Sequence, residues 1–87
     1  NIELKFKSFG WLTINLENGN DIDEVKAALI QAKEKCFSGK PVVIIMKTVM
    51  GNGVDYMMGT HKWHGIAPNN KELEIALNQN PETLNDY

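Results

Sequence analysis

The sequence contains little cysteine, no long apolar run and no surplus of basic charge. Cys36 is the single cysteine among 87 residues, which excludes an internal disulfide framework and fits a reducing compartment. No stretch approaches the ~20 apolar residues that a membrane-spanning helix requires. No signal peptide is visible either. We therefore expect a cytoplasmic location with no membrane partner.

The charge balance gives no sign of a nucleic-acid partner. The formal net charge is −2, and lysines are interspersed with acidic residues along the chain. A nucleic-acid-binding surface normally shows a basic face, so we expect none here. The length allows one small core but is short for a parallel sheet covered on both faces. Because the chain begins with Asn1 rather than Met, we expect a processed product or a fragment.

The strongest structural signal is the apolar run at residues 41–46. Its continuous Val and Ile residues predict a fully buried strand that is covered on both faces. In open α/β sheets, ligands lie outside the carboxyl ends of the strands. The residues that follow this run are therefore the expected place for a functional site.

The residues before that run predict a βαβ unit. Residues 1–9 have near-helical apolar spacing, which predicts the last turns of a helix that Gly10 terminates. Alternation over residues 12–16 predicts a strand. Asp21 is a good helix N-cap, and Glu24 completes a capping box. The helix that follows is expected to end at Gly39, with a stripe of small and apolar residues at Val25, Ala28, Leu29, Ala32 and Cys36.

We interpret Cys36 as a small residue on the last helical turn rather than as a catalytic thiol. Strand, helix and strand over about 35 residues form a βαβ unit, which should have a right-handed crossover. Two strands do not close a structure, and open parallel edges of Val and Ile are an aggregation hazard. The chain is therefore predicted to be a piece of a larger α/β domain.

Residues 46–68 show no periodicity. A loop of about twenty residues in a compact domain is usually functional or disordered. After the loop, Asn69 and Glu72 have capping-box spacing. They predict a helix with an apolar stripe at Leu73, Ala76 and Leu77, and residues 78–87 are expected to be polar and frayed.

The loop carries the candidate chemical groups. The Gly51-Asn52-Gly53 segment is compatible with a short phosphate loop or with a tight turn that needs positive φ. Lys47 at the strand end is compatible with an anion contact or with an ordinary exposed lysine. His61 and His64 lack a Cys or acidic partner at ligand spacing, so we expect no metal site in this chain.

The histidines are better suited to hydrogen bonding or proton transfer near neutral pH. Trp63, which lies between them, is expected to anchor the loop by packing.

Five short motifs in register resemble transketolases, in particular the amino-terminal subunit of split transketolases. They cover nearly the whole chain and are Phe9-Gly10-Trp11, Asn18-Gly19-Asn20-Asp21, Lys40-Pro41, Lys47-Thr48-x-x-Gly51-x-Gly53 and Trp63-His64-Gly65-x-x-Pro68.

The resemblance implies that residues 1–87 are the carboxy-terminal third of a thiamine diphosphate-binding domain. It implies that His64 reaches the diphosphate and the donor sugar, as a catalytic, cofactor-binding and substrate-binding residue. Lys47 and Gly51 would contact the cofactor, and His61 would be a secondary substrate contact. A divalent cation, Mg or Ca, would be held by residues outside this chain.

The resemblance further implies transfer of a two-carbon ketol unit between sugar phosphates, as in the pentose phosphate pathway. The implied partner is a pyrimidine-binding subunit or domain, in a homodimer or heterotetramer. Two positions depart from the family: Met50 stands where some transketolases carry lysine, and Asn20 stands where the family carries histidine. The alternatives are a deoxyxylulose-phosphate synthase-like enzyme and a non-catalytic α/β interaction module.

Overall fold

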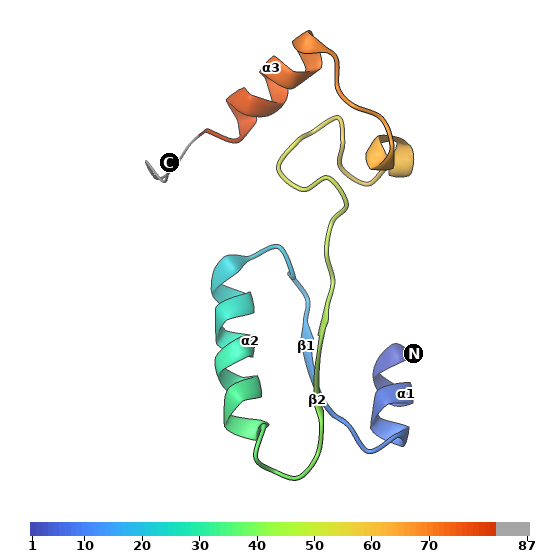
Figure 1. Ribbon diagram of the computed structural model, residues 1–87, viewed down its shortest axis with the longest axis vertical. Helices are drawn as coiled ribbons and strands as arrows, with labels where there is room; N and C mark the ends of the chain where they lie inside the picture. Colours follow the sequence, from blue (N-terminus) through green and yellow to red (C-terminus); the bar gives the residue numbers. More distant parts are fainter. Residues whose placement is uncertain (82–87) are drawn as a thin grey trace. The chain divides into compact units, whose positions relative to one another are not determined.

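The computed structural model describes residues 1–81 and divides the chain into two compact units that meet after Thr48. The first unit contains helix α1 (Ile2–Ser8), strand β1 (Leu12–Leu16), helix α2 (Ile22–Lys35) and strand β2 (Val42–Met46) (Figure 1). The second unit contains the short 3₁₀ helix η1 (His61–His64) and helix α3 (Asn70–Gln79).

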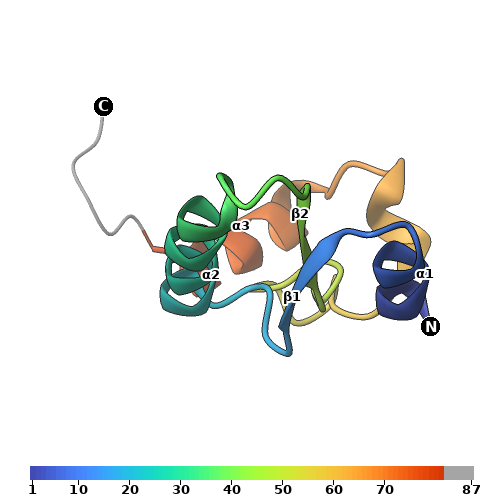
Figure 2. The same ribbon diagram turned by 90° about the horizontal axis from the view of Figure 1, so that it is seen from below.

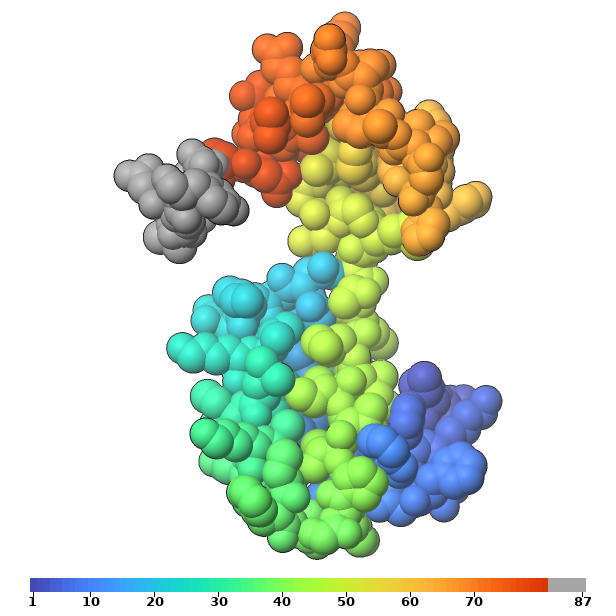
Figure 3. Space-filling model, viewed as in Figure 1, coloured from blue at the N-terminus to red at the C-terminus, as the bar shows by residue number. Residues whose placement is uncertain are grey.

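The two strands of the first unit pair in parallel, which confirms the predicted βαβ unit. The register runs from Leu12 opposite Val42 to Leu16 opposite Met46. Helices α1 and α2 lie on opposite sides of the strand pair, as two perpendicular views show (Figures 1 and 2). Helix α2 packs closely against the strand that follows it (Figure 3). The first unit is therefore a small three-layer α/β arrangement.

The core of the first unit is very small. Among residues 1–81, only Ile14, Leu16 and Ala28 are buried, and they lie between β1 and α2. Alternate residues of β1 point toward the helix, because successive side chains of a strand face opposite sides of the sheet. Partly buried neighbours complete this cluster: Val25, Ala32, Val42 and Ile44.

The prediction that residues 41–46 form a fully buried strand is wrong for this chain. Residues 42–45 are only half-buried, and Met46 is 45% exposed. The described residues form only a two-stranded sheet, so each strand has one unpaired edge. A continuous Val and Ile run needs neighbours on both sides to become buried, and residues 1–81 supply just one.

Helix α2 begins where the sequence predicts. The Asp21 side chain accepts hydrogen bonds from the amides of Asp23 and Glu24, both at 2.9 Å. The predicted reciprocal bond of a capping box is not formed, because the Asp21 amide donates to the Asn18 carbonyl instead, at 3.2 Å. Asp21 is therefore confirmed as the N-cap, but its amide bonds to the preceding turn and not to the Glu24 side chain.

The end and the buried face of α2 differ from the prediction. The helix ends at Lys35 with Cys36 as an exposed C-cap, and Gly39 lies beyond it in the connecting turn with φ +77°. The chain leaves the helix early because the Cys36 amide bonds to Lys33, three residues back, at 3.3 Å. Leu29 is 57% exposed, so the apolar stripe is narrower than predicted.

Helix α1 is attached to β1 by polar and aromatic contacts. Phe6 and Trp11 form an edge-to-face pair with centroids 5.3 Å apart. The helix ends at Ser8, and Gly10 has φ +82°, as predicted for the terminating glycine. Thr13 donates a hydrogen bond to Glu3 Oε1 at 3.2 Å, so a strand side chain holds the helix.

Glu3 is also paired with Lys7 in the same helix, with 2.6 Å between Nζ and Oε1. Hydrogen bonds from Lys7 and then from Asn15 and Thr13 lower the pKa of Glu3 below its ordinary value of 4.5. A carboxylate whose pKa is lower in the folded than in the unfolded state stabilises the fold at pH values above the unfolded-state pKa. This contribution is lost as the pH falls through the folded-state pKa.

We predict that the free energy of unfolding falls less for Glu3→Gln than for the unsubstituted chain when the pH drops below about 4.5, because glutamine does not titrate. Urea unfolding monitored by circular dichroism at pH 7 and pH 3.5 measures this difference. Glu34→Gln, on the exposed side of α2, is the control and should follow the unsubstituted chain. An identical pH dependence for Glu3→Gln and the unsubstituted chain would contradict the prediction.

Helix α3 of the second unit begins with the predicted capping box. The Asn69 side chain accepts from the Glu72 amide at 2.9 Å, and the Glu72 carboxylate accepts from the Asn69 amide at 2.8 Å. The helix continues through Gln79, so it extends past the point where fraying was predicted. The predicted stripe is not covered within residues 1–81, since Leu73 is 44% and Leu77 is 62% exposed. The rest of the predicted frayed tail, residues 82–87, lies outside the described residues.

Candidate functional site

Lys47 lies directly after β2, at the carboxyl end of the strand pair. Its amide donates to the Leu16 carbonyl at 3.0 Å, and its own carbonyl accepts from the Gly19 amide at 2.6 Å. Its ammonium group forms an ion pair with Glu17. Both side chains are largely exposed, and an exposed ion pair contributes little stability. The lysine is therefore available to an incoming anion at small cost.

Gly19 is required by the close packing of the two strand ends. A Cβ at this position would lie 2.7 Å from Met46 Cβ and 2.8 Å from the Lys47 carbonyl oxygen. No side chain fits in that space without a shift of the backbone. The glycine of the Asn18-Gly19-Asn20 turn therefore allows the turn before α2 to contact the segment that carries Lys47.

Gly51 begins a compact turn in the second unit. It has φ +70°, and a Cβ would lie 2.6 Å from the carbonyl carbon of Met57. The Gly59 amide closes the turn by donating to the Met50 carbonyl at 3.0 Å. The tight-turn interpretation of this segment is therefore confirmed.

The same turn leaves backbone donors free. Among residues 1–81, the amides of Gly51 and Gly53 have no hydrogen-bond partner, and both residues are exposed. Backbone N–H groups in glycine-rich turns can bind the oxygen atoms of an anion. The structure is thus compatible with the phosphate-loop interpretation as well, which remains a prediction.

Asn80 secures the other glycine of this segment. Its side-chain amide donates to the Gly53 carbonyl at 2.9 Å and to the Ala76 carbonyl at 3.1 Å. A Cβ on Gly53 would lie 2.6 Å from Asn80 Oδ1, so glycine is needed for this contact. Sequence analysis missed Asn80, although an asparagine directly after a helix is a recognised end signal.

The two histidines lie in η1, a helical turn that sequence analysis missed. Thr60 caps this turn by accepting a hydrogen bond from the Lys62 amide at 3.3 Å, so Thr60 before the turn was the available signal. Side chains at positions i and i+3 of a 3₁₀ helix eclipse one another. His61 and His64 therefore share one side of the turn, and both are exposed.

Trp63 anchors η1, as predicted. Its indole Nε1–H donates to the Tyr56 carbonyl at 3.0 Å, and its ring meets the Tyr56 ring edge-to-face with centroids 5.0 Å apart. The Lys62 ammonium lies 5.0 Å from the Trp63 ring centroid, within cation–π range. Tyr56 was missed by sequence analysis, because its sequence position carries no periodic signal.

Partial burial and then the charge of Glu72 raise the pKa of the Tyr56 hydroxyl above its ordinary value. The hydroxyl therefore stays protonated through the neutral pH range. It donates to the Glu72 carbonyl oxygen at 2.8 Å.

The predicted site residues belong to both units. Gly51, His61 and His64 lie in the second unit, whereas Lys47 belongs to the first. Imidazole, ammonium and glycine amide groups are hydrogen-bond donors, which suits the oxygen atoms of a phosphate or diphosphate. Within residues 1–81, no group of three or more His, Cys, Asp or Glu side chains could hold a metal ion. The donors of each unit, taken separately, therefore suit an anionic group.

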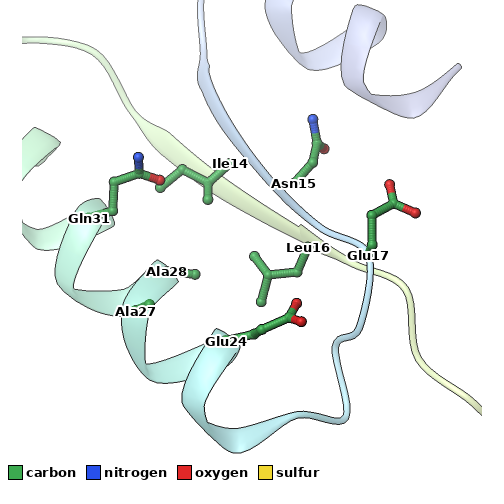
Figure 4. Close-up of a pocket in the computed structure, with 8 residues that line it drawn as sticks. All are labelled: Ile14, Asn15, Leu16, Glu17, Glu24, Ala27, Ala28 and Gln31. Carbon is green, nitrogen blue, oxygen red and sulfur yellow. The ribbon is translucent and has the colours of Figure 1, made fainter.

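The first unit also contains a groove of about 480 Å³ beside β1. Ile14 and Leu16 point into it toward Ala28 of α2, whereas Asn15 points away (Figure 4). No residue of β2 lines the groove, so it opens along the unpaired edge of β1. An open apolar groove beside an unpaired strand edge is typical of an incomplete sheet.

None of the helices in residues 1–81 has the length and apolar character needed to cross a membrane.

Comparison with known proteins places this α/β unit in a family. The model of the family described as "Transketolase, thiamine diphosphate binding domain" matches residues 1–82. The chain therefore belongs to the transketolase thiamine diphosphate-binding domain family. No solved structure matches the chain.

Similar curated proteins are transketolases from bacteria and plants. The transketolase of Staphylococcus epidermidis is 40% identical over 75 residues, which cover 86% of this chain and 11% of that protein. The probable transketolase of Streptococcus pneumoniae is 41% identical over 61 residues, or 70% of this chain and 9% of that protein. The chloroplastic transketolase-1 of Arabidopsis thaliana is 34% identical over 79 residues, or 90% of this chain and 10% of that protein. The chain thus spans about a tenth of the length of these relatives.

Gly51 and Gly59 offer a matched test of the turn. Both have φ +70°, but only Gly51 faces a neighbouring backbone, since nothing lies within 4 Å of a Cβ at Gly59. We predict that Gly59→Ala costs about 1 kcal/mol of backbone strain, whereas Gly51→Ala costs more and opens the turn. Amide hydrogen exchange of the N–H group at position 59, relative to the intrinsic rate of the residue present there, measures the opening. Equal protection in the two variants would contradict the prediction.

Proposed function

We propose that residues 1–87 are the carboxy-terminal third of the thiamine diphosphate-binding domain of a split transketolase, in its amino-terminal subunit. The complete enzyme would transfer a two-carbon ketol unit from a ketose phosphate to an aldose phosphate. The observation that carries this proposal is the family match over residues 1–82, which extends through both units of the chain.

The first unit supports the placement within a larger domain. Only three residues are buried among those described, and the groove beside β1 leaves the free edge of this small core open. Burial of apolar surface is the main stabilising contribution to folding. A further parallel strand on the free edge of β1, supplied by another part of the same domain, would close the open side of this groove.

The donors at the site would hold the cofactor. When bound, thiamine diphosphate supplies the carbanion chemistry, and the protein supplies position and electrostatics. Lys47 and Gly51 would donate to diphosphate oxygens through the ammonium and the free amide. His64 would donate from an imidazole nitrogen to the diphosphate or to a donor-sugar hydroxyl, with His61 beside it as a substrate contact. The divalent cation would be held by residues outside this chain.

We further propose a cytoplasmic enzyme in which a pyrimidine-binding subunit or domain completes the site, in a homodimer or heterotetramer. Sugar phosphates would be the substrates. Met50, which is 54% exposed at the site loop, cannot supply the positive charge that some transketolases have at this position. Lys47 is then the charged candidate for the phosphate contact in this chain.

We predict that the isolated 87-residue chain binds thiamine diphosphate weakly or not at all, because the metal ligands and much of the sheet lie elsewhere. Isothermal titration calorimetry with magnesium present measures this affinity, with the complete enzyme as the positive control. Micromolar binding by the isolated chain would contradict the prediction.

We predict that His64→Ala in the complete enzyme lowers kcat/KM for a ketose phosphate by about 10- to 150-fold, the range for loss of a charged hydrogen bond. His61→Ala should have a smaller effect. Steady-state kinetics and thiamine diphosphate titration measure both variants.

The His64→Ala variant and an assay with each donor separate the alternatives. Unchanged turnover and cofactor affinity in His64→Ala would favour a non-catalytic α/β module. Activity with pyruvate as the donor, and none with a ketose phosphate, would favour a deoxyxylulose-phosphate synthase-like enzyme.

A further inference from the structure

The irregular loop of the second unit is held along α3 by side-chain hydrogen bonds. The Asp55 amide donates to Gln79 Oε1 at 3.0 Å, near the end of the helix. The Tyr56 hydroxyl donates to the Glu72 carbonyl at 2.8 Å, in its first turn. Asn80 adds the bond to the Gly53 carbonyl at 2.9 Å. Loop residues 53–56 are therefore held by contacts with both ends of helix α3.

Tyr56 differs from the other attachments because it also contacts η1. Its carbonyl accepts the Trp63 indole N–H at 3.0 Å, and the two rings pack edge-to-face. One residue thus connects the first turn of α3 to the helical turn that carries both histidines. Tyr56 and Trp63 are half-buried, whereas His61 and His64 on the same segment are exposed.

A single 3₁₀ turn cannot set its own orientation. Four residues provide too few hydrogen bonds to be stable alone, so external contacts must determine which side faces the site. Trp63 is the half-buried residue of η1 and immediately precedes His64. Loss of the contacts between Trp63 and Tyr56 would remove the restraint on the turn and therefore on the His64 imidazole.

We propose that Tyr56 and Trp63 are positioning residues that orient His64, with α3 as their support. This inference deepens the proposed function and rests on it. Tyr56 holds the loop through its hydroxyl bond to Glu72 and holds Trp63 through its carbonyl. Neither residue needs to touch the cofactor or the sugar; they preorganise the imidazole that does.

The test is a double-mutant cycle in the complete enzyme with Tyr56→Phe and His64→Ala. Tyr56→Phe removes the hydroxyl bond and keeps the aromatic contact. We expect kcat/KM for a ketose phosphate to fall by about two- to tenfold, the value of one neutral hydrogen bond. In the background of His64→Ala, Tyr56→Phe should have no further effect, because coupled residues are not additive.

Trp63→Phe provides a second variant, since it keeps an aromatic ring and loses the indole N–H. It should show the same non-additivity with His64→Ala. Gln79→Ala is the matched control, because it removes an attachment of the same loop to α3 that does not involve Tyr56. It should leave kcat/KM unchanged. Circular dichroism and thermal unfolding verify that each variant is folded.

The outcomes distinguish this inference from the proposed function. If His64→Ala lowers activity and Tyr56→Phe and Trp63→Phe each reduce it further in that background, the positioning role is overturned while the proposed function stands. An equal loss in Gln79→Ala and Tyr56→Phe would also overturn it, since general loosening of the loop would then be sufficient. If His64→Ala has no effect, the proposed function itself fails.

Discussion

The parallel pairing of β1 with β2 is the constraint on which the first unit depends. It places Leu16 opposite Met46, so both strands end at the same edge of the sheet. The Lys47 carbonyl then receives the Gly19 amide, and the Lys47 ammonium meets Glu17. Helix α2 connects the strands and buries Ile14 and Leu16 against Ala28, which stabilises the pairing. The position of Lys47 follows from this one register.

The second unit is organised by a different principle. Its shape depends on side chains that satisfy backbone groups, because the loop between Val49 and Pro68 contains little regular structure. Gln79 of α3 and Asn80 directly after the helix supply two of these side chains, and the Glu72 carbonyl accepts the Tyr56 hydroxyl. Such bonds are sensitive to single substitutions, since each one positions several residues.

The predicted site residues share one chemical character. The described residues contribute donors: an ammonium group, two imidazoles and free glycine amides. Such donors stabilise phosphate oxygens, whereas Mg²⁺ and Ca²⁺ prefer oxygen ligands. The core of the first unit is small for a related reason. A parallel sheet gains most of its burial from neighbouring strands and helices, and both edges of this sheet are open among the described residues.

The sequence by itself determined most of the elements, the family and several local details. Alternation predicted β1, a continuous apolar run predicted β2, and helical spacing predicted α2 and α3. Capping residues at Asp21 and Asn69 predicted the starts of both helices, because these features depend on neighbouring residues. Tertiary structure alone decided that β2 is half-buried and that Tyr56 and Asn80 hold the histidine loop. These outcomes depend on contacts between residues far apart in the chain or on neighbours that residues 1–81 lack, and no local pattern encodes them.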